Sequence, residues 1–206
     1  MATGRFAPSP TGDLHLGNLR TALLAWLFAR CSGGRFLMRV EDLDPVTSTR
    51  EHEARQLADL VALGLDWDGA VVRQSERRGR HEEVLMELVD RGLTYPCFCT
   101  RREVQEAAAA PHAAPGRYPG TCRDLTSAAV REREGAGRPA ALRLRASGEP
   151  VTIVDRLRGP VTGAADDIVL RRNDGVPAYN VAVVVDDADQ GVEEVVRGDD
   201  LLDATP

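Results

Sequence analysis

Residues 4–18 read GRFAPSPTGDLHLGN, and this stretch joins a short strand to a helix through a loop rich in proline and glycine. The two prolines and Gly12 break regular structure, and an apolar pattern with helical spacing follows at once. A helix N-terminus offers unpaired backbone N–H groups and the positive end of the helix dipole. His15 adds a side-chain donor, and Gly17 lets a ligand approach the backbone closely. The stretch therefore predicts a phosphate-binding loop.

The residues that follow predict a parallel α/β fold. A second strand, expected over residues 34–42, completes a strand–helix–strand unit, which is the first unit of a parallel sheet. Apolar residues four apart on the first helix are expected to pack on this sheet, and a cysteine at its end is expected to be buried. These residues are Leu19, Leu23 and Leu27, with Leu24 and Phe28 beside them, and Cys31.

Two further helices are expected before residue 95. Ser48 and Glu51 have the spacing of a capping box, and the helix that they open is expected to end near Gly64. Its apolar side carries Ala54, Leu57, Leu60 and Val61. The next helix spans residues 82–91 and is expected to stop at Gly92.

The composition changes after residue 94, which predicts an inserted subdomain. Cysteines, an alanine run and proline–glycine pairs replace the helical pattern over residues 95–123, and short alternating segments over 136–172 predict small strands. We expect three parts: the first half of a nucleotide-binding domain at 1–94, the insertion at 95–172, and the second half of that domain at 173–206. The valines of residues 178–187 favour a strand by propensity alone.

Composition restricts the class of protein. A net charge of −6 over 206 residues argues against a protein that coats nucleic acid non-specifically. No apolar run approaches the length that spans a membrane, and the first residues do not resemble a secretion signal. Arginines cluster in two places, where they form either a local basic surface or solvated helix faces. The clusters are residues 73, 77, 78 and 80, and residues 101, 102, 117 and 123.

Three cysteines in the insertion predict a structural metal site. Cys97, Cys99 and Cys122 supply three of the four thiolate or imidazole ligands that zinc prefers. The fourth ligand is open: His112 is the conventional choice by chemistry, and Tyr118 is the alternative. Three reduced cysteines that bind nothing are the competing interpretation, which a lone Cys-x-Cys pair would favour.

The loop at residues 5–18 resembles the HIGH motif of class I aminoacyl-tRNA synthetases, and its form RFAPSPTGDLHLGN is similar to the branch of that family that handles glutamate. The resemblance continues to the last residue. It implies an α/β fold with a Rossmann-type, parallel-sheet catalytic domain and an inserted zinc-binding α+β subdomain. It also implies a helix over residues 178–187, and a cytoplasmic, monomeric protein without a membrane segment.

The resemblance assigns functional residues position by position. It implies a catalytic role for His15 and for Asn18, which stands where many relatives have a second histidine. ATP, bound with Mg²⁺, would contact Pro8, His15, Gly17 and Asn18. L-Glutamate would contact Arg5, Phe6, Ala7, Pro8, Ser9, Glu41, Tyr179 and Arg197. One structural Zn²⁺ would be held by Cys97, Cys99, Tyr118 and Cys122, since relatives show Tyr-x-x-x-Cys after Cys-x-Cys. Asp42, Asp44, Asp186 and Asp187 match acidic positions of the family without an assigned role.

Three functions remain open at this point. The segments Gln190-Gly191-Val192 and Asp200-Leu201-Leu202 look more like the short members of the glutamate branch, which attach glutamate to the queuosine base of tRNA(Asp). The first alternative is a catalytic fragment of an ordinary glutamyl-tRNA synthetase. The second is a non-catalytic, zinc-stabilised module that binds RNA or a partner. The lysine loop KMSKS of the family does not occur in the 206 residues, so we expect weak or no adenylate formation by this chain.

Overall fold

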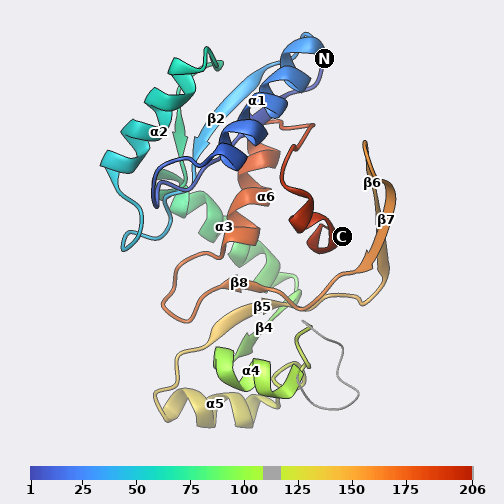
Figure 1. Ribbon diagram of the computed structural model, residues 1–206. Coiled ribbons are helices and arrows are strands. Elements are labelled where there is room, and N and C mark those ends of the chain that lie inside the picture. The colour runs from blue at the N-terminus through green and yellow to red at the C-terminus, as the bar shows by residue number, and fades with distance from the viewer. Residues whose placement is uncertain (109–116, 206) are drawn as a thin grey trace. The chain divides into compact units, whose positions relative to one another are not determined.

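The computed structural model describes residues 1–108 and 117–205, which divide into two compact units (Figure 1). The first unit comprises Met1–His81 and Ala182–Leu201, and the second comprises Glu82–Val181 and Leu202–Pro206. Among the described residues, no helix combines the length and the apolar character needed to cross a membrane.

A parallel three-stranded sheet forms the centre of the first unit, as the sequence predicted. The strands β1 (Gly4–Phe6), β2 (Phe36–Val40) and β3 (Val72–Arg73) lie in the order β1-β2-β3, and both pairs are parallel. A single parallel bridge joins Gly4 to Glu194 on the other side of β1. The connecting helices are α1 (Leu16–Cys31) and α2 (Arg50–Ala62), and a 3-10 turn, η1 (Gln74–Arg77), follows β3.

Helix α1 buries a different face from the one predicted. Ala22, Ala25 and Ala29 are buried and Leu19 packs against the core as predicted, whereas the leucines at 23, 24 and 27 are 36–43% exposed. The reason is the close approach of the helix to β1: a Cβ atom on Gly4 would lie 3.2 Å from that of Ala29. Only small side chains fit such a contact. Cys31 is exposed, so its predicted burial was wrong.

Helix α2 also differs from the prediction. Its N-cap is Thr49 instead of Ser48, and the Thr49 hydroxyl accepts a hydrogen bond from the N–H of His52, so no capping box forms with Glu51. The buried residues are Glu53, Gln56 and Leu60, because two polar side chains find partners inside the unit. Leu57 is partly buried against the core, while Ala54 and Val61 are exposed.

The second unit is α+β and antiparallel. Its sheet has the order β4-β5-β8, and a separate hairpin pairs β6 with β7, which confirms the short strands predicted over 136–172. The strands are β4 (Thr94–Cys97), β5 (Ala141–Leu144), β6 (Pro150–Asp155), β7 (Gly159–Ala164) and β8 (Val169–Arg171), with helices α4 (Arg101–Ala108) and α5 (Ser127–Gly135).

Helices α3 (Arg78–Asp90) and α6 (Tyr179–Asp189) each contribute residues to both units. Helix α3 begins four residues before its predicted start, and the chain leaves it at Gly92, whose positive φ of 67° favours glycine. Helix α6 confirms the helix that the family resemblance implied over 178–187, against the strand propensity of its valines. A last 3-10 turn is η2 (Asp199–Ala204).

Candidate functional site

The predicted phosphate loop ends at a histidine that caps helix α1. The Nδ1 atom of His15 accepts the N–H groups of Gly17 at 3.0 Å and Asn18 at 3.4 Å. The Asn18 amide oxygen accepts the His15 N–H at 3.2 Å, which completes a capping box. Because Nδ1 is an acceptor, a neutral ring carries its proton on Nε2, and His15 presents an N–H donor there.

Gly17 is required by the histidine itself. A Cβ atom at this position would lie 2.9 Å from Cε1 and 3.0 Å from Nδ1 of His15, closer than real Cβ contacts. Any side chain would therefore displace the capping ring. The sequence indicated a glycine that lets a ligand approach, and the structure adds this local reason.

The loop between β1 and α1 is held from behind by Gln56 of α2. The Gln56 amide donates to the carbonyl oxygens of Ser9 at 3.0 Å and Gly12 at 2.7 Å, and the side chain is buried. The N–H of Glu41 donates to the Pro8 carbonyl at 2.9 Å, so the loop also joins the end of β2. Sequence reasoning missed Gln56; its only signal was a polar residue beside an apolar helix face.

The ends of β1 and β2 bring Arg5 and Glu41 into one buried network of charges. Arg5 donates two hydrogen bonds of 3.3 Å to the Asp187 carboxylate on α6. Arg39, fully buried on β2, contacts Asp187 at 2.6 Å and Glu41 at 3.3 Å. Arg39 also donates to the Gln190 side chain at 2.8 Å. Sequence reasoning missed Arg39, although an arginine inside a buried strand signals carboxylate partners.

Burial raises the pKa of Glu41 to about 7. The cations of Arg39 and Arg5 act in the opposite direction, and the neighbouring anion of Asp187 adds to the increase. The carboxyl is only 8% exposed. Glu41 therefore changes charge near neutral pH in the presence of two arginines.

Asp186 forms a second buried cluster next to this network. Its carboxylate accepts hydrogen bonds from Arg77 at 2.6 Å and Gln74 at 2.9 Å, and it lies 2.9 Å from Nε2 of His81. Burial favours the neutral acid, but the bonds from His81, Arg77 and Gln74 together lower the pKa of Asp186 below its usual value. A structural role follows for this aspartate, which the sequence left without one.

The remaining predicted residues take varied positions. Phe6 lies in the core, Pro8 is buried, Ala7 is partly exposed and Ser9 is exposed. Arg197 is exposed and donates to the Leu201 carbonyl at 3.4 Å. Tyr179 is half exposed at the start of α6 and belongs to the second unit.

Two acidic residues after β2, which the sequence left without a role, hold the local backbone. Asp42 accepts hydrogen bonds from the backbone and hydroxyl of Ser75, and Asp44 accepts the N–H of Val46.

The arginines of the first predicted cluster are committed to partners inside the protein. Arg73 pairs with Glu53 at 2.6 Å, and Arg78 donates to the Leu43 carbonyl at 2.8 Å. Arg80 pairs with Asp189 at 3.1 Å, as Arg77 does at 2.5 Å. These contacts favour a structural role for the cluster over a free basic surface.

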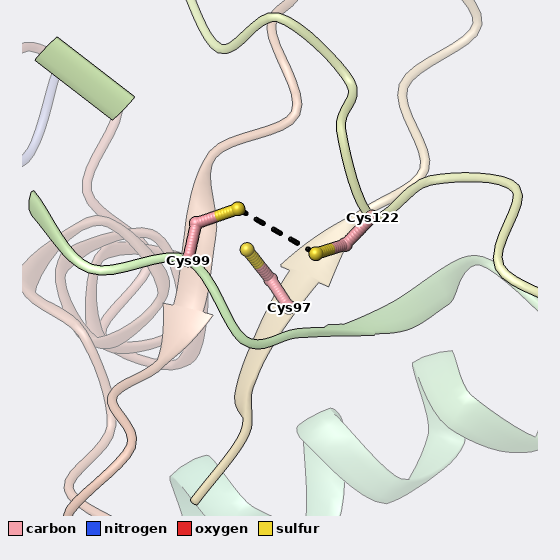
Figure 2. Close-up of side chains that lie close together, drawn as sticks. All are labelled: Cys97, Cys99 and Cys122. Carbon is pink, nitrogen blue, oxygen red and sulfur yellow. Dashed lines mark hydrogen bonds between the residues drawn. The ribbon is translucent and has the colours of Figure 1, made fainter. Parts of the chain in front are cut away.

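Three cysteine side chains converge in the second unit (Figure 2). The sulfur atoms of Cys97, Cys99 and Cys122 all lie within 4.8 Å of one another, and those of Cys99 and Cys122 are 3.5 Å apart. The Tyr118 hydroxyl oxygen lies 3.3 Å from Cys97 Sγ and 3.5 Å from Cys99 Sγ. Strand β4 and the loop after it supply the first two cysteines, and the turn before α5 supplies Cys122.

This arrangement fits a tetrahedral metal ion. Four ligands around zinc, with Zn–S distances of about 2.3 Å, are separated by about 3.8 Å, close to the distances found here. Burial raises the pKa of Cys99 to about 11 and raises that of Tyr118 above its usual value. Hydrogen bonds from Tyr118 and Arg143 outweigh burial and lower the pKa of Cys97. A phenolate at Tyr118 therefore needs the charge of the metal itself. His112 lies outside the described residues.

Comparisons with known proteins identify the family of the chain. The family model described as tRNA synthetases class I (E and Q), catalytic domain, matches residues 1–206. The chain is 66% identical over 203 residues to a Nocardia farcinica protein called Glutamyl-Q tRNA(Asp) synthetase, covering 98% of this chain and 65% of that relative. It is 45% identical over 210 residues to a Synechococcus protein called Glutamate–tRNA ligase, covering 98% of this chain and 44% of that relative.

A solved structure shows the same fold. The crystal structure of a glutamate tRNA ligase from Elizabethkingia meningosepticum, in complex with its amino acid, matches with a TM-score of 0.83 and 30% identity. The match covers 98% of this chain and 45% of that one. The chain thus spans about two thirds of the Nocardia relative and less than half of the other two. With its parallel sheet and histidine-capped helix, and with every residue inside the family match, the chain belongs to the class I tRNA synthetase (E and Q) catalytic domain family.

Proposed function

We propose that the protein activates L-glutamate with ATP to glutamyl-adenylate and transfers the glutamate to the queuosine base in the anticodon of tRNA(Asp). The observation that supports the first step is the charge network in which Arg5 of β1 binds Asp187 and Arg39 of β2 joins Asp187 to Glu41, beside the loop that ends at His15. Ligands of open α/β sheets bind at this edge.

The activation step is an in-line displacement at the α-phosphorus of ATP. A carboxylate oxygen of glutamate forms a bond to phosphorus, the bond to the β-phosphate oxygen breaks, and pyrophosphate leaves with its electron pair. The Nε2–H of His15, the N–H groups of the Asn18 side-chain amide and the positive end of the α1 dipole would stabilise the phosphate oxygens. Mg²⁺ would accompany the ATP, and Pro8 and Gly17 would line its site.

The amino acid would be held by charge at both ends. The Arg5 guanidinium is proposed to bind the side-chain carboxylate, and Glu41 the α-ammonium group. Arg5 is paired with the Asp187 carboxylate in this structure. A substrate carboxylate would therefore bind Arg5 alongside Asp187 or in its place. Phe6, Ala7, Pro8, Ser9, Tyr179 and Arg197 are proposed to complete the site.

The transfer step is supported by similarity alone. A nucleophilic group of the modified base would attack the carbonyl carbon of the adenylate, and AMP would leave. The relative that is 66% identical is called Glutamyl-Q tRNA(Asp) synthetase, whereas the relative called Glutamate–tRNA ligase is 45% identical. An ordinary glutamyl-tRNA synthetase is therefore the second candidate. The internal pairing of the first arginine cluster speaks against a module that only binds RNA.

We further propose that one structural Zn²⁺ is bound by Cys97, Cys99, Tyr118 and Cys122. The four ligand atoms come from two segments of the second unit, residues 97–99 and 118–122, so the metal would cross-link these segments and stabilise the fold of that unit. The insertion at residues 95–172, with the catalytic domain divided between 1–94 and 173–206, is part of this proposal.

The decisive experiment offers labelled glutamate, ATP and Mg²⁺ to the protein with two pools of tRNA, one from a queuosine-making strain and one from a strain without queuosine. Label on the queuosine pool alone would support the proposed transfer. Equal labelling of both pools would favour an ordinary glutamyl-tRNA synthetase. Glutamate-dependent exchange of pyrophosphate into ATP, measured without tRNA, tests the activation step separately, and its occurrence would exclude the non-catalytic alternative.

A further inference from the structure

Arg39 stands at the centre of the buried charge network, although it is not among the predicted substrate contacts. Its side chain is fully buried on β2, two residues before Glu41, so the two side chains project from the same face of the strand. One guanidinium nitrogen contacts Asp187 at 2.6 Å and Gln190 at 2.8 Å, and another contacts Glu41 at 3.3 Å. A buried arginine thus joins the two carboxylates that surround the proposed glutamate site.

The distances show how Asp187 is divided between two arginines. Arg39 approaches its carboxylate to 2.6 Å, whereas both contacts from Arg5 are 3.3 Å long. The shorter contact carries the stronger charge-assisted hydrogen bond. Arg39 therefore pairs with Asp187 more closely than Arg5 does, and the single negative charge of Asp187 is shared between two arginines.

The same guanidinium acts on Glu41. The charged groups that face this carboxylate are Arg5 from β1, Arg39 from β2 and Asp187 from α6. The Asp186 carboxylate of α6 lies 4.0 Å from the Arg39 guanidinium, and Arg77 and His81 pair with that carboxylate. Burial drives the Glu41 carboxyl toward its neutral form, which cannot pair with an ammonium group. Arg39 is the cation in hydrogen-bond contact with it.

We propose that Arg39 is a positioning residue of the amino-acid site: it pairs with Glu41 and so favours the charged carboxylate that the substrate's ammonium group needs, and it holds Asp187 so that Arg5 can also bind the substrate's side-chain carboxylate. The inference rests on the proposed glutamate activation and adds a residue that acts through Glu41 and Arg5 without touching the substrate.

The test compares Arg39→Met, which removes the charge, with Arg39→Lys, which keeps it on a smaller head group. Arg35→Met, which removes an exposed arginine just before the same strand, is the matched control. Binding of L-glutamate and of ATP is measured separately by calorimetry between pH 6 and 9. The titration of the Glu41 carboxyl is followed by carbon-13 NMR without any ligand.

In Arg39→Met we expect glutamate binding at pH 7 to weaken about tenfold or more, with partial recovery at higher pH, because a shift of one pKa unit changes the ionised fraction by up to about tenfold. The Glu41 midpoint should rise, and ATP binding should stay within about twofold of the parent. Arg39→Lys should lie between the parent and Arg39→Met. If the methionine variant does not fold, the lysine variant and its Glu41 titration decide the question.

An unchanged Glu41 midpoint in both variants, or equal losses of glutamate and ATP binding, would overturn the assignment of Arg39. A parent protein that binds no glutamate would instead contradict the proposed function. The ligand-free titration of Glu41 would still show whether Arg39 favours the charged form of that carboxyl, so the experiment separates a wrong assignment of Arg39 from a wrong proposed function.

Discussion

At the scale of single residues, the site depends on charges that are buried together. Glu41, Arg39 and Arg5 have little or no exposure, so each charge relies on its neighbours instead of water. Glu41 carries the clearest consequence, because burial raises its pKa from 4.5 to about 7 despite two nearby arginines. The protein therefore keeps a carboxylate in an environment that costs stability.

This cost gives a prediction of pH dependence. Between pH 4.5 and 7 the folded protein holds the Glu41 proton that the unfolded chain has already released, so its stability falls as pH rises. We expect Glu41→Gln to lack this decline and to gain up to about 3 kcal/mol over the parent by pH 8. Urea denaturation at a series of pH values measures it. Glu87→Gln, at an exposed position of α3, is the control, and the same pH slope in the parent and Glu41→Gln would contradict the prediction.

At the scale of elements, two helices position the loop by contacts that their apolar patterns did not reveal. Helix α1 turns its alanines toward β1, and α2 turns a glutamine toward the carbonyls of the loop. A close backbone approach to Gly4 accounts for the buried face of α1, and hydrogen bonds to loop carbonyls account for the buried glutamine of α2. Hydrophobic periodicity identified the helices correctly but not their orientation.

The packing of α1 predicts that enlarging a buried alanine costs more stability than truncating an exposed leucine. Ala29→Leu should destabilise the protein by about 1–3 kcal/mol, because extra atoms must enter a contact that already places Ala29 against Gly4. Leu27→Ala should change stability by less than about 1 kcal/mol, since that leucine is 39% exposed. Denaturant titration of both variants gives the comparison. A larger loss for Leu27→Ala would support the face that periodicity predicted.

The hold of α2 on the loop gives a second prediction. Gln56→Leu removes both hydrogen bonds to the Ser9 and Gly12 carbonyls at similar side-chain volume. We expect a loss of about 1–3 kcal/mol, because the Gly12 and Ser9 carbonyls both lose the Gln56 donor, although the Ser9 carbonyl keeps the N–H of Thr11. Faster hydrogen exchange at the Thr11 N–H, which bonds to Ser9, should accompany it. Gln105→Leu, at an exposed position of α4, should change neither; an unaltered loop in Gln56→Leu would show that Gln56 does not hold it.

At the scale of the whole molecule, the apolar clusters of the two units differ in size. The first has an apolar core around the parallel sheet, including Phe36, Met38 and Leu60. The apolar cluster of the second unit is smaller. It contains Tyr95 and Phe98 together with the proposed metal ligands Cys97, Tyr118 and Cys122. A metal that joins these segments would compensate for the smaller core.

Removal of the metal should therefore affect the units unequally. With a zinc chelator, we expect backbone amides of β4, β5 and β8 to lose protection from hydrogen exchange while those of β1 and β2 keep it. Cys122→Ser should reproduce the loss and lower the zinc content measured by mass spectrometry. Cys31→Ser, at the exposed cysteine outside the cluster, should change neither. Equal protection with and without chelator would contradict a structural metal.

The sequence by itself determined the order of the elements, the parallel start of the sheet, the cysteine cluster and the family, because spacing, turn residues and a 15-residue motif are local properties. Helix α6 needed the family resemblance, since its valines favour a strand. Only the tertiary structure decided which helix faces are buried and which charges meet. Arg39, Glu41 and Asp187 lie up to 148 positions apart in the chain, and the close approach of α1 to β1 depends on Gly4 and Ala29 together. Such pairings arise from packing between distant segments, and no local pattern encodes them.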